Sequence, residues 1–461
     1  MPATPPNGPE DSREHAARLL AQSKELADLG RHEEALAPIE AAFETYYRVS
    51  DAGGSVFLGD FALAFDEQSA RLASLGRSEE ALAAIETCVD FYRQAARAKP
   101  DAALPEHARV LSVQTKRLIE LGRYEEALVV SEEAVRLGRR PEVPLGDLAL
   151  SLGSLSSTLQ GMGRREDALP AIEEAVATFR RLANARPDTF LPNLARTLHN
   201  LSSVLSHLGR HPAALVAIEE SISIDRRLAG SDPDEFLPDL AVSLNYQASM
   251  FRDLRRHDDA LIAIDESVAI RRRLADSRPE AFRADLAQSL RNQSAMLRDL
   301  GRHDDALSAI EEAVGVGRGL PDESLPGLAA SLNIRAAILR DLGRHENALT
   351  AIGQAVAIYR RLVESRPDAF LSELANALEN QSAMLKDLGR HEDALASVDE
   401  ALHRVLPKLE RAHYFLHDSG ASLLVNYLEL GKTLGRPPPL QMVLRMQAVL
   451  ISAGLISGDE P

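Results

Sequence analysis

The sequence predicts an all-α protein, an α-solenoid of about nine to ten two-helix units with a period near 46 residues. Residues 292–307, NQSAMLRDLGRHDDAL, return 88 residues later as residues 380–395 with only two conservative exchanges. Gly-Arg pairs recur at steps of 46, 46, 41, 46, 46, 46, 42 and 46 residues, with Arg255 and Arg256 filling one slot. A fixed period of this length is typical of a solenoid, in which each repeat packs only on its neighbours.

Each unit divides into two expected helices. In the first helix, apolar residues such as Leu290, Leu297 and Leu300 follow a helical spacing. This helix ends at the Gly of the pair, which supplies a left-handed turn. The second helix begins with a mostly acidic pair and then Ala-Leu, and acidic side chains suit the positive end of a helix dipole. Four prolines are expected to end the second helix and open the next unit. They are Pro187, Pro233, Pro279 and Pro367.

Small side chains occupy two positions of every unit, where the helices are expected to touch. Crossing helices approach to about 8–10 Å only when such residues mark the contact. Five residues after the glycine slot the chain always has Ala: Ala35, Ala81, Ala127, Ala168, Ala214, Ala260, Ala306, Ala348 and Ala394. Seven residues before it stand Ser23, Ser69, Thr115, Ser156, Ser202, Ala248, Ser294, Ala336 and Ser382.

Two of the steps are four or five residues shorter than the others. The missing residues fall near residues 136–146 and 316–327, and the loss equals about one turn of helix. We therefore expect the second helix of these two units to lose its last turn while the packing register survives.

Charge and composition exclude several classes of site. A formal net charge of −17 argues against a nucleic-acid surface and a polybasic membrane anchor, because both need concentrated basic residues. The single cysteine, Cys88, leaves no disulfide framework and no cysteine-rich metal site. The N-terminus has no apolar signal core, and no run approaches the ~18 apolar residues of a membrane span. The sequence therefore predicts a cytoplasmic protein without nucleic-acid or membrane partners. Abundant Arg and Ala with scarce Lys favour a bacterial source.

The repeat resembles the tetratricopeptide repeat over roughly residues 11–436. The small residue before the turn, the Leu-Gly that closes the first helix, the acidic pair, the Ala and the terminal Pro match that family's pattern. The unit is longer than the ~34 residues of the standard repeat, so both helices are expected to be longer. The Leu-x-Asn phrase at 198–200, 290–292 and 378–380 is similar to the variant found in kinesin light chains. The resemblance implies a right-handed superhelix whose first helices line the concave surface.

The two ends of the chain depart from the repeat. Residues 1–10 are rich in Pro and are expected to form a disordered tail. Gly435 falls in register, but three prolines at 437–439 then replace the acidic start of the second helix. We therefore expect a repeat array over residues 11–436, followed by a capping helix and tail over residues 437–461.

No constellation of residues predicts an enzyme, a metal site or a cofactor. The sequence LGKT at 430–433 lacks the earlier Gly that a phosphate loop requires. Histidines that follow the Gly-Arg pairs lie one repeat apart, near 10 Å, which is too far to share a zinc ion. We expect them to be turn residues that pack against the neighbouring unit: His32, His211, His257, His303, His345 and His391. Cys88 occupies a slot that holds Ala or Ser elsewhere, which favours a small buried filler.

Charged and amide side chains also recur at fixed positions. The Arg after each Gly lies at the negative end of the first helix and is expected to bond its free carbonyls. Acids near the same helix end are unfavourable there, so we expect them to pair with Arg residues, including those of neighbouring repeats. These acids are Asp253, Asp299, Asp341 and Asp387. A glutamine column has a structural explanation as a ladder between repeats: Gln22, Gln68, Gln114, Gln247, Gln293 and Gln381.

The concave surface that the resemblance implies consists of non-core positions of the first helices. Asn donates and accepts hydrogen bonds, so it can hold an extended peptide backbone, and Arg offers a fork for carboxylates. The predicted partner-binding residues are His199, Asn200, Asn245, Arg252, Arg291, Asn292, Arg298, Asn333, Arg340, Asn380 and Lys386. The alternative explanation is that these are ordinary polar residues of solvent-facing helices.

We therefore expect a non-enzymatic scaffold that binds an extended segment or a helix of another protein in its groove. The alternative function is a regulatory receptor whose superhelix tightens around a peptide signal. Such receptors usually carry an effector module, and the sequence shows no helix-turn-helix or catalytic segment.

Overall fold

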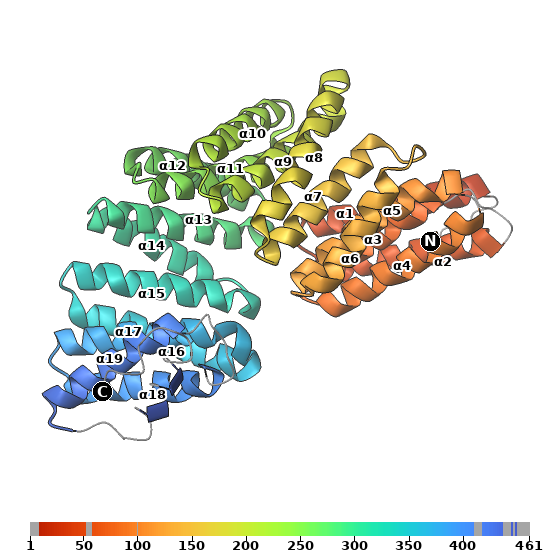
Figure 1. Cartoon of the computed structure of the whole chain (residues 1–461). Helices are drawn as coiled ribbons and strands as arrows, with labels where there is room; N and C mark the ends of the chain where they lie inside the picture. Colours follow the sequence, from red (N-terminus) through yellow and green to blue (C-terminus); the bar gives the residue numbers. More distant parts are fainter. Residues whose placement is uncertain are drawn as a thin grey trace, which may run out of the picture. The chain divides into compact units, whose positions relative to one another are not determined.

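The computed structural model describes residues 9–51, 58–98, 100–409, 417–436, 444–445 and 448–449. Within these residues the chain forms nineteen α-helices and one short 3-10 helix, without a β-strand (Figure 1). The first helices of the repeats are α1 (Pro9–Asp28), α3 (Leu58–Ser74), α5 (Pro100–Glu120), α7 (Leu145–Gly161), α9 (Pro187–His207), α11 (Pro233–Asp253), α13 (Pro279–Asp299), α15 (Leu325–Asp341), α17 (Pro367–Asp387) and α19 (His417–Thr433). The second helices are α2 (His32–Asp51), α4 (Ser78–Ala98), α6 (Tyr124–Gly138), α8 (Arg165–Ala185), α10 (His211–Ser231), α12 (His257–Ser277), α14 (His303–Arg318), α16 (His345–Ser365) and α18 (His391–Leu409). Nine helix pairs and a tenth first helix confirm the predicted all-α repeat architecture.

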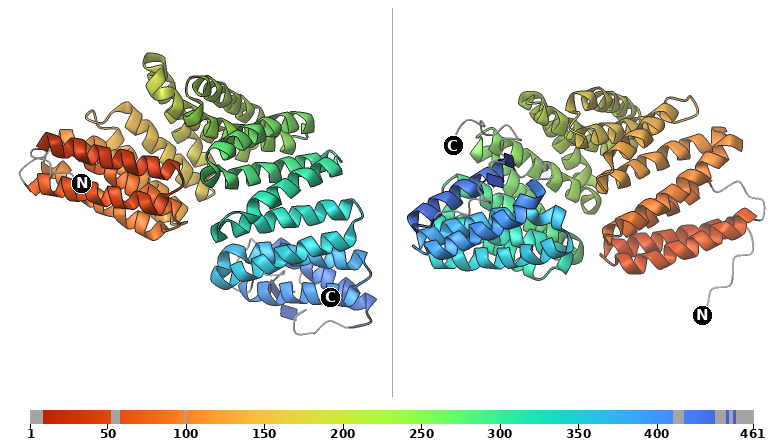
Figure 2. Two further views of the ribbon diagram at one scale, coloured as in Figure 1. Left: turned by 180° about the vertical axis from the view of Figure 1, so that it is seen from behind. Right: turned by 60° about the horizontal axis from the view of Figure 1, so that its bottom comes forward.

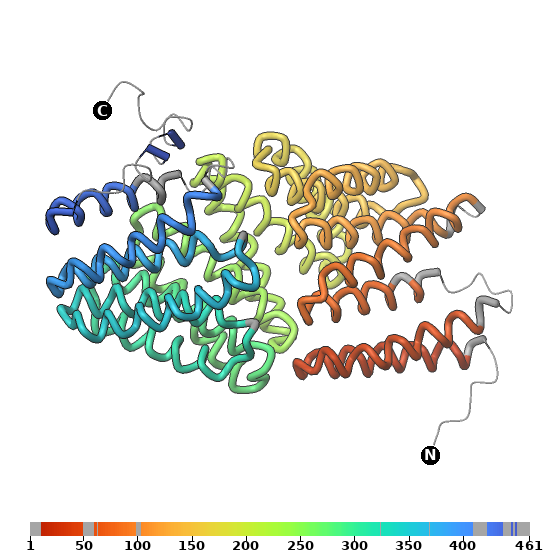
Figure 3. Tube along the Cα trace, turned by 90° about the horizontal axis from the view of Figure 1, so that it is seen from below, coloured from red at the N-terminus to blue at the C-terminus, as the bar shows by residue number. Residues whose placement is uncertain are grey.

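The chain divides into two compact units. The N-terminal unit comprises residues 1–254 and 273–281, and the C-terminal unit comprises residues 255–272 and 282–461. Helices α1–α11 belong to the N-terminal unit, α14–α19 belong to the C-terminal unit, and α12 and α13 contribute residues to both. Within each unit, successive helices lie side by side (Figure 2). The cyan-to-blue trace in Figure 3 runs back and forth from helix to helix through the C-terminal unit.

Each first helix ends in a left-handed turn. The backbone angle φ is 72° at Gly301 and lies between 65° and 78° at the nine glycines of these turns. The Arg302 N–H donates to the Leu297 carbonyl at 2.9 Å, and the Gly301 N–H donates to the Arg298 carbonyl at 2.9 Å. These bonds satisfy carbonyls at the end of the helix, as a glycine in this position is expected to allow. Arg255 adopts the same turn at φ 59°.

The Arg that follows the glycine uses its side chain differently from the prediction. Arg123 Nε and Nη2 donate to the two carboxylate oxygens of Glu126, both at 2.7 Å. The same pairing recurs in Arg31–Glu34, Arg77–Glu80, Arg164–Asp167, Arg256–Asp259, Arg302–Asp305 and Arg390–Asp393. The prediction that this side chain bonds the free carbonyls is therefore wrong. The backbone amide bonds them, and the guanidinium pairs with a charged acid three residues away.

The two columns of small residues form the contact between the helices of a pair. All nine alanines after the turn are fully buried, and so are the nine small residues before it. Ser202 Oγ donates to the Ala214 carbonyl at 2.8 Å, and Ser294 Oγ donates to the Ala306 carbonyl at 2.7 Å. The predicted helix contact is confirmed, and these hydroxyls bond across it.

Each short step removes residues from two helices, the second helix of one repeat and the first helix of the next. Helices α6 and α14 have 15 and 16 residues against 21 in α8. The helices that follow, α7 and α15, have 17 residues each against 21 in α9. A Cβ on Gly138 would lie 3.0 Å from the Leu148 Cα, so this glycine lets α6 end close against α7. The expectation that only the second helix shortens is therefore wrong.

Prolines open first helices as predicted, because α9, α11, α13 and α17 begin at Pro187, Pro233, Pro279 and Pro367. A proline at the first helical position loses no hydrogen bond and has a suitable φ. Helix α1 begins at Pro9. Of the predicted tail and capping segment, residues 1–8, 437–443, 446–447 and 450–461 lie outside the described residues.

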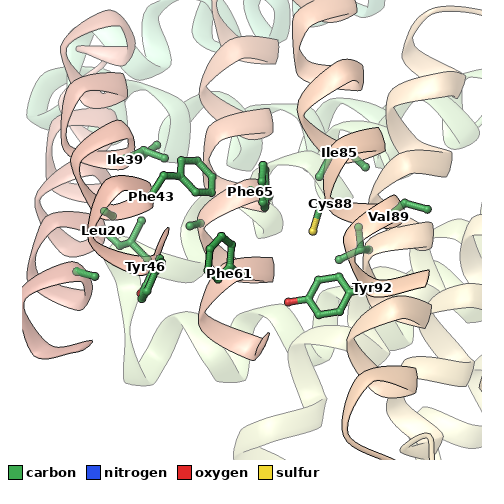
Figure 4. Close-up of a cluster of buried hydrophobic side chains, with 14 of the residues drawn as sticks. Leu20, Ile39, Phe43, Tyr46, Phe61, Phe65, Ile85, Cys88, Val89 and Tyr92 are labelled. Carbon is green, nitrogen blue, oxygen red and sulfur yellow. The ribbon is translucent and has the colours of Figure 1, made fainter. Parts of the chain in front are cut away.

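Cys88 lies in the apolar core of the N-terminal repeats. Figure 4 shows it among Ile85, Val89 and Tyr92, and its side chain is fully buried. Burial raises the pKa of its thiol to about 12, so the thiol stays protonated at neutral pH. The predicted role as a small buried filler is confirmed.

Candidate binding site

The first helices of neighbouring repeats lie against one another. The strongest contacts between helices two apart in the chain join α1 with α3, α3 with α5, α5 with α7, α7 with α9, α15 with α17 and α17 with α19. Long side chains bridge the second helices instead, as Arg180 Nη2 lies 2.7 Å from Glu220 Oε2. In these repeats the first helices lie closer to one another than the second helices do, and the first helices carry the residues that were predicted to bind a partner.

A hollow of about 590 Å³ opens on the first helices of the N-terminal unit. Its walls come from α5, α7 and α9, with contributions from α3 and from Phe179 of α8. Its residues fall in columns counted back from the glycine of the turn. Arg109, Leu150 and Arg196 stand 13 before it, Asp66, Ser112 and Gly153 stand 10 before it, Val113, Ser154 and Asn200 stand 9 before it, and Lys116 and Ser157 stand 6 before it. The columns 9 and 10 before the glycine are those that supplied the predicted Asn and His residues.

Four cationic side chains and one carboxylate line this hollow, although the whole chain is strongly acidic. Arg117 is buried, and its Nε donates to Ser69 Oγ at 2.7 Å while its Nη1 donates to Glu120 Oε2 at 2.7 Å. Arg109 pairs with Glu106 one turn earlier in the same helix. Two of the four cations are thus already partly neutralised by the carboxylates of Glu106 and Glu120, which lie in the same helix.

The other two cations, Lys116 and Arg196, are exposed to solvent. Arg196 Nη2 donates to the Asn193 side-chain oxygen at 3.1 Å, a neutral acceptor in its own helix. Among the residues that the structure describes, neither cation forms an ion pair with a carboxylate. These two charges are therefore available to a bound molecule.

Asp66 is the carboxylate of the hollow. Its pKa is raised, first by burial between the walls of the hollow and second by the charge of Glu67. The neighbouring cations Arg117, Arg109 and Lys116 act in the opposite direction. The side chain is exposed to solvent. The hollow therefore holds one carboxylate among its four cationic side chains.

The predicted cations of the C-terminal unit join neighbouring repeats. Arg298 Nε donates to Asp341 Oδ2 at 2.5 Å, and Arg340 donates to both carboxylate oxygens of Asp387. The prediction that acids at these helix ends pair with Arg across repeats is confirmed for Asp341 and Asp387. The two guanidinium groups keep donors free, because an Arg side chain carries five.

Amide side chains of the same unit also bond across repeats. Asn380 Nδ2 donates to Asn333 Oδ1 at 3.0 Å, and Lys386 Nζ donates to Asn426 Oδ1 at 2.8 Å. The pair Asn333 and Asn380 uses one donor and one acceptor, which leaves the Asn333 amide hydrogens and the Asn380 carbonyl for other partners.

Arg291 is a half-buried cation on α13. Burial lowers the pKa of its guanidinium, and a Cβ on Gly327 of α15 would lie 3.4 Å from its Nη1. Asn292 beside it is also partly buried.

The remaining predicted residues lie on α9 and α11. His199 Nδ1 lies 3.5 Å from Ser243 Oγ, its ring centre lies 4.9 Å from that of Tyr246, and burial lowers its pKa. Asn245 is partly buried, and Arg252 Nη2 lies 3.8 Å from Asp253 Oδ1 of its own helix. Asn200 is the one member of the predicted set among the residues lining the hollow. Contact of the whole set with a partner stays a prediction.

Residues of the glutamine and histidine columns contact neighbouring helices of the same chain. Gln293 Nε2 donates to Asp265 Oδ1 at 2.7 Å, and Gln381 Oε1 accepts from Ser397 Oγ at 3.2 Å, so these glutamines bond second helices rather than each other. His345 Nδ1 lies 3.9 Å from Asp387 Oδ2 of the next repeat, in line with packing against the neighbour. In the described ranges, no three His, Cys, Asp or Glu side chains gather closely enough to hold a metal ion. None of the described helices has the length and hydropathy needed to cross a bilayer.

Sequence reasoning missed Arg109, Lys116 and Arg196. They stand 13 and 6 residues before the glycine, at positions that the prediction did not sample, and Arg109 and Lys116 also lie in a repeat earlier than those it chose. The available signal was their positive charge on first helices of an acidic chain.

Comparison with protein families identifies the repeat. A model described as tetratricopeptide repeat matches residues 285–361, and a second with the same description matches residues 148–188 and 194–235. A model described as anaphase-promoting complex subunit 5 matches residues 234–282. No curated protein sequence matches the chain.

Several solved structures are similar. BtubC (BKLC) from P. vanneervenii is 18% identical over 52% of this chain and 90% of its own, with a TM-score of 0.44. A Rap protein complexed with competence and sporulation factor is 12% identical over 85% of this chain and 98% of its own, with a TM-score of 0.49. A signal transduction ATPase with numerous domains and a tetratricopeptide repeat sensor, from Pyrococcus horikoshii, is 12% identical over 81% of this chain and 53% of its own. Its TM-score of 0.52 shows a shared fold.

Tetratricopeptide repeats generally form non-enzymatic scaffolds for protein interaction or regulation. The left-handed turns, the buried columns of small residues and the matched repeat models all describe one unit repeated along the chain. The chain therefore contains tetratricopeptide repeats, which the family models match over residues 148–188, 194–235 and 285–361.

Proposed function

We propose that this protein is an interaction scaffold that binds a segment of a partner protein on the face formed by its first helices. The observation that carries the proposal is the hollow of about 590 Å³ across α5, α7 and α9. Stacked repeats present neighbouring helices as one continuous surface, so a segment lying across them contacts several repeats at once. The binding free energy is then shared among repeats.

The lining of the hollow suits a polypeptide. Ser157 Oγ donates to the Gly153 carbonyl of its own helix at 3.0 Å, which leaves its oxygen lone pairs for a donor such as a peptide N–H. Asn200 offers both a donor and an acceptor. Val113 and Leu150 supply apolar contact between these polar groups. Such a mixture, with a few polar groups among apolar ones, is typical of ligand sites.

The proposal extends to the equivalent face of the C-terminal unit. There the half-buried Arg291 and the unused amide groups of Asn333 and Asn380 are the residues that would contact a partner. We further propose a cytoplasmic location, because the only cysteine in the sequence, Cys88, is a buried free thiol.

Site-specific crosslinking in the native host tests the proposal. A photoreactive amino acid at Ser154, in the wall of the hollow, is compared with the same amino acid at Glu173, an exposed residue of the second helix α8. We expect one partner protein to be captured in high yield from position 154 and not from position 173. Equal capture at the two positions, or no adduct at position 154, would contradict the proposal.

A further inference from the structure

We infer that the segment held in the hollow is acidic, and that Lys116 and Arg196 select it. This inference rests on the proposed function and adds the chemistry of the partner. The charge of the hollow motivates it, because four cationic side chains and one carboxylate line it in a chain that is acidic overall. Most Arg residues of the turns pair with an acid three residues further on, as Arg123 does with Glu126. Lys116 and Arg196 instead line the hollow and form no ion pair among the described residues, although the carboxylate of Asp66 is near enough to interact with Lys116.

The electrostatics of the hollow favour a carboxylate guest over a neutral one. Arg109 and Arg117 add positive charge nearby, although each already meets a Glu of its own helix. Asp66 is the one carboxylate among the residues lining the hollow, so the four cationic side chains there outnumber it. Charge-assisted hydrogen bonds to Arg and Lys are stronger than bonds between neutral groups, and they gain strength where water is confined.

The same cations do not make the hollow a nucleic-acid site. Single-stranded nucleic acid is held by stacking of its bases on accessible aromatic rings as well as by charge. The aromatic residue among those lining the hollow is Phe179, whose side chain is only 1% exposed. A base therefore has no open ring there on which to stack, whereas carboxylate side chains need only the exposed cations.

The positions of the two cations set a spacing for the acids they bind. Lys116 is on α5 and Arg196 is on α9, with α7 between them. Neighbouring packed helices are about 8–10 Å apart, and the two residues also differ by about two turns along their helices. The separation is therefore roughly 20 Å, which an extended peptide spans in about six residues. Two acidic positions about six residues apart in one extended segment fit this arrangement.

Synthetic peptides test the inference on the full chain. The probe is a short fluorescent peptide of Gly, Ser and Ala that carries two Asp-Asp pairs about six residues apart. One control peptide has Asn in place of every Asp, and a second has the same four Asp residues side by side. Fluorescence anisotropy is measured at low and moderate salt. We expect the spaced acidic peptide to bind more tightly than both controls, and added salt to weaken it.

Matched variants locate the binding. The double variant Lys116→Gln with Arg196→Gln is compared with Arg181→Gln, which removes an exposed Arg from the second helix α8. We expect the double variant to bind the acidic peptide roughly tenfold or more weakly, and Arg181→Gln to bind it almost as wild type does. Both cations are exposed, so the substitutions should preserve the fold, and an unchanged helical circular dichroism spectrum checks this.

Equal affinity for the Asp and Asn peptides, or unchanged affinity in the double variant, would overturn the inference. The same holds if wild type fails to bind the acidic peptide. Failure of this inference is distinguishable from failure of the proposed function. A partner crosslinked at position 154 through a neutral or basic segment removes the acidic specificity and leaves the scaffold intact. No adduct at position 154 removes both.

Discussion

Arg340 of α15 donates hydrogen bonds to both carboxylate oxygens of Asp387, the last residue of α17 in the next repeat. One repeat earlier, Arg298 Nε donates to one carboxylate oxygen of Asp341. An acid at the end of a helix meets the negative end of the helix dipole and is unfavourable alone. The Arg of the preceding repeat compensates, so an arrangement that is unfavourable within one helix becomes a contact between two.

We expect Arg340→Gln to lower the stability of the C-terminal unit by about 0.5–1 kcal/mol, because the pair is partly exposed. Arg344→Gln is the control, since Arg344 is exposed and the residue three further on is Asn347 rather than an acid. Urea unfolding of the two variants and wild type at low and high salt measures the difference. A loss for Arg340→Gln no larger than for Arg344→Gln would show that the pair contributes nothing.

Asp225 is a buried acid in α10, and it accepts a hydrogen bond from Ser243 Oγ at 2.9 Å. Burial raises its pKa from 3.8 to about 6, against the effect of that bond. Because the folded-state pKa is the higher one, the contribution to stability is full below about pH 3.8 and is lost as the pH rises through about 6. The ionised carboxylate therefore destabilises the protein at neutral pH.

Asp225→Asn mimics the protonated carboxyl at every pH. We expect it to raise the free energy of unfolding by about 2–3 kcal/mol at pH 7.5 and to change it little near pH 4. Thermal unfolding at the two pH values, with the exposed Glu219→Gln as control, tests this. A variant that is no more stable than wild type at pH 7.5 would mean that the folded protein tolerates the ionised Asp225.

Cys88 should be unreactive in the folded protein, because its thiol is fully buried and its pKa is about 12. We expect a thiol-directed maleimide at pH 8 to label it only at the rate at which the N-terminal repeats open. Labelling with and without denaturant, followed by mass spectrometry, measures this. Fast labelling of the folded chain would mean that these repeats open far more often than their packed core suggests.

The repeat could be predicted from the sequence because its requirements are local and recur in each unit. Ala260, for example, is fully buried although its turn has Arg255 in place of Gly. Helix lengths in the short repeats were not predictable, because they depend on how closely Gly138 approaches Leu148 of the next helix. The choice of the Arg123 side chain between a carbonyl and Glu126 likewise depends on distances that only the folded turn fixes.

The sequence predicted two of the helix positions that line the hollow, but it did not predict most of the residues that line it. Residues 9 and 10 before the glycine do line the hollow, as Asn200 does. However, the prediction favoured residues that recur, and recurring cations such as Arg340 bond neighbouring repeats. The cations left for a partner, Lys116 and Arg196, occupy columns in which only two of the nine repeats carry a basic residue, so periodicity could not reveal them.

Arg255 holds a left-handed turn that glycine occupies in the other repeats, with φ 59°. A side chain in this conformation costs about 1–2 kcal/mol. Replacement by glycine removes that strain but adds flexibility to the unfolded chain. We therefore expect Arg255→Gly to stabilise the helix pair of α11 and α12 by about 0.5–1 kcal/mol. The reverse change, Gly301→Ala, should destabilise the helix pair of α13 and α14 by about 1 kcal/mol, purely through the backbone, since nothing lies within 4 Å of the added Cβ.

Repeat arrays need not unfold in one step, so amide hydrogen exchange in α12 and α14 is the suitable measurement. Slower exchange in α12 of Arg255→Gly and faster exchange in α14 of Gly301→Ala are expected. Faster exchange in both would mean that the Arg255 side chain stabilises its turn by more than the backbone strain it imposes.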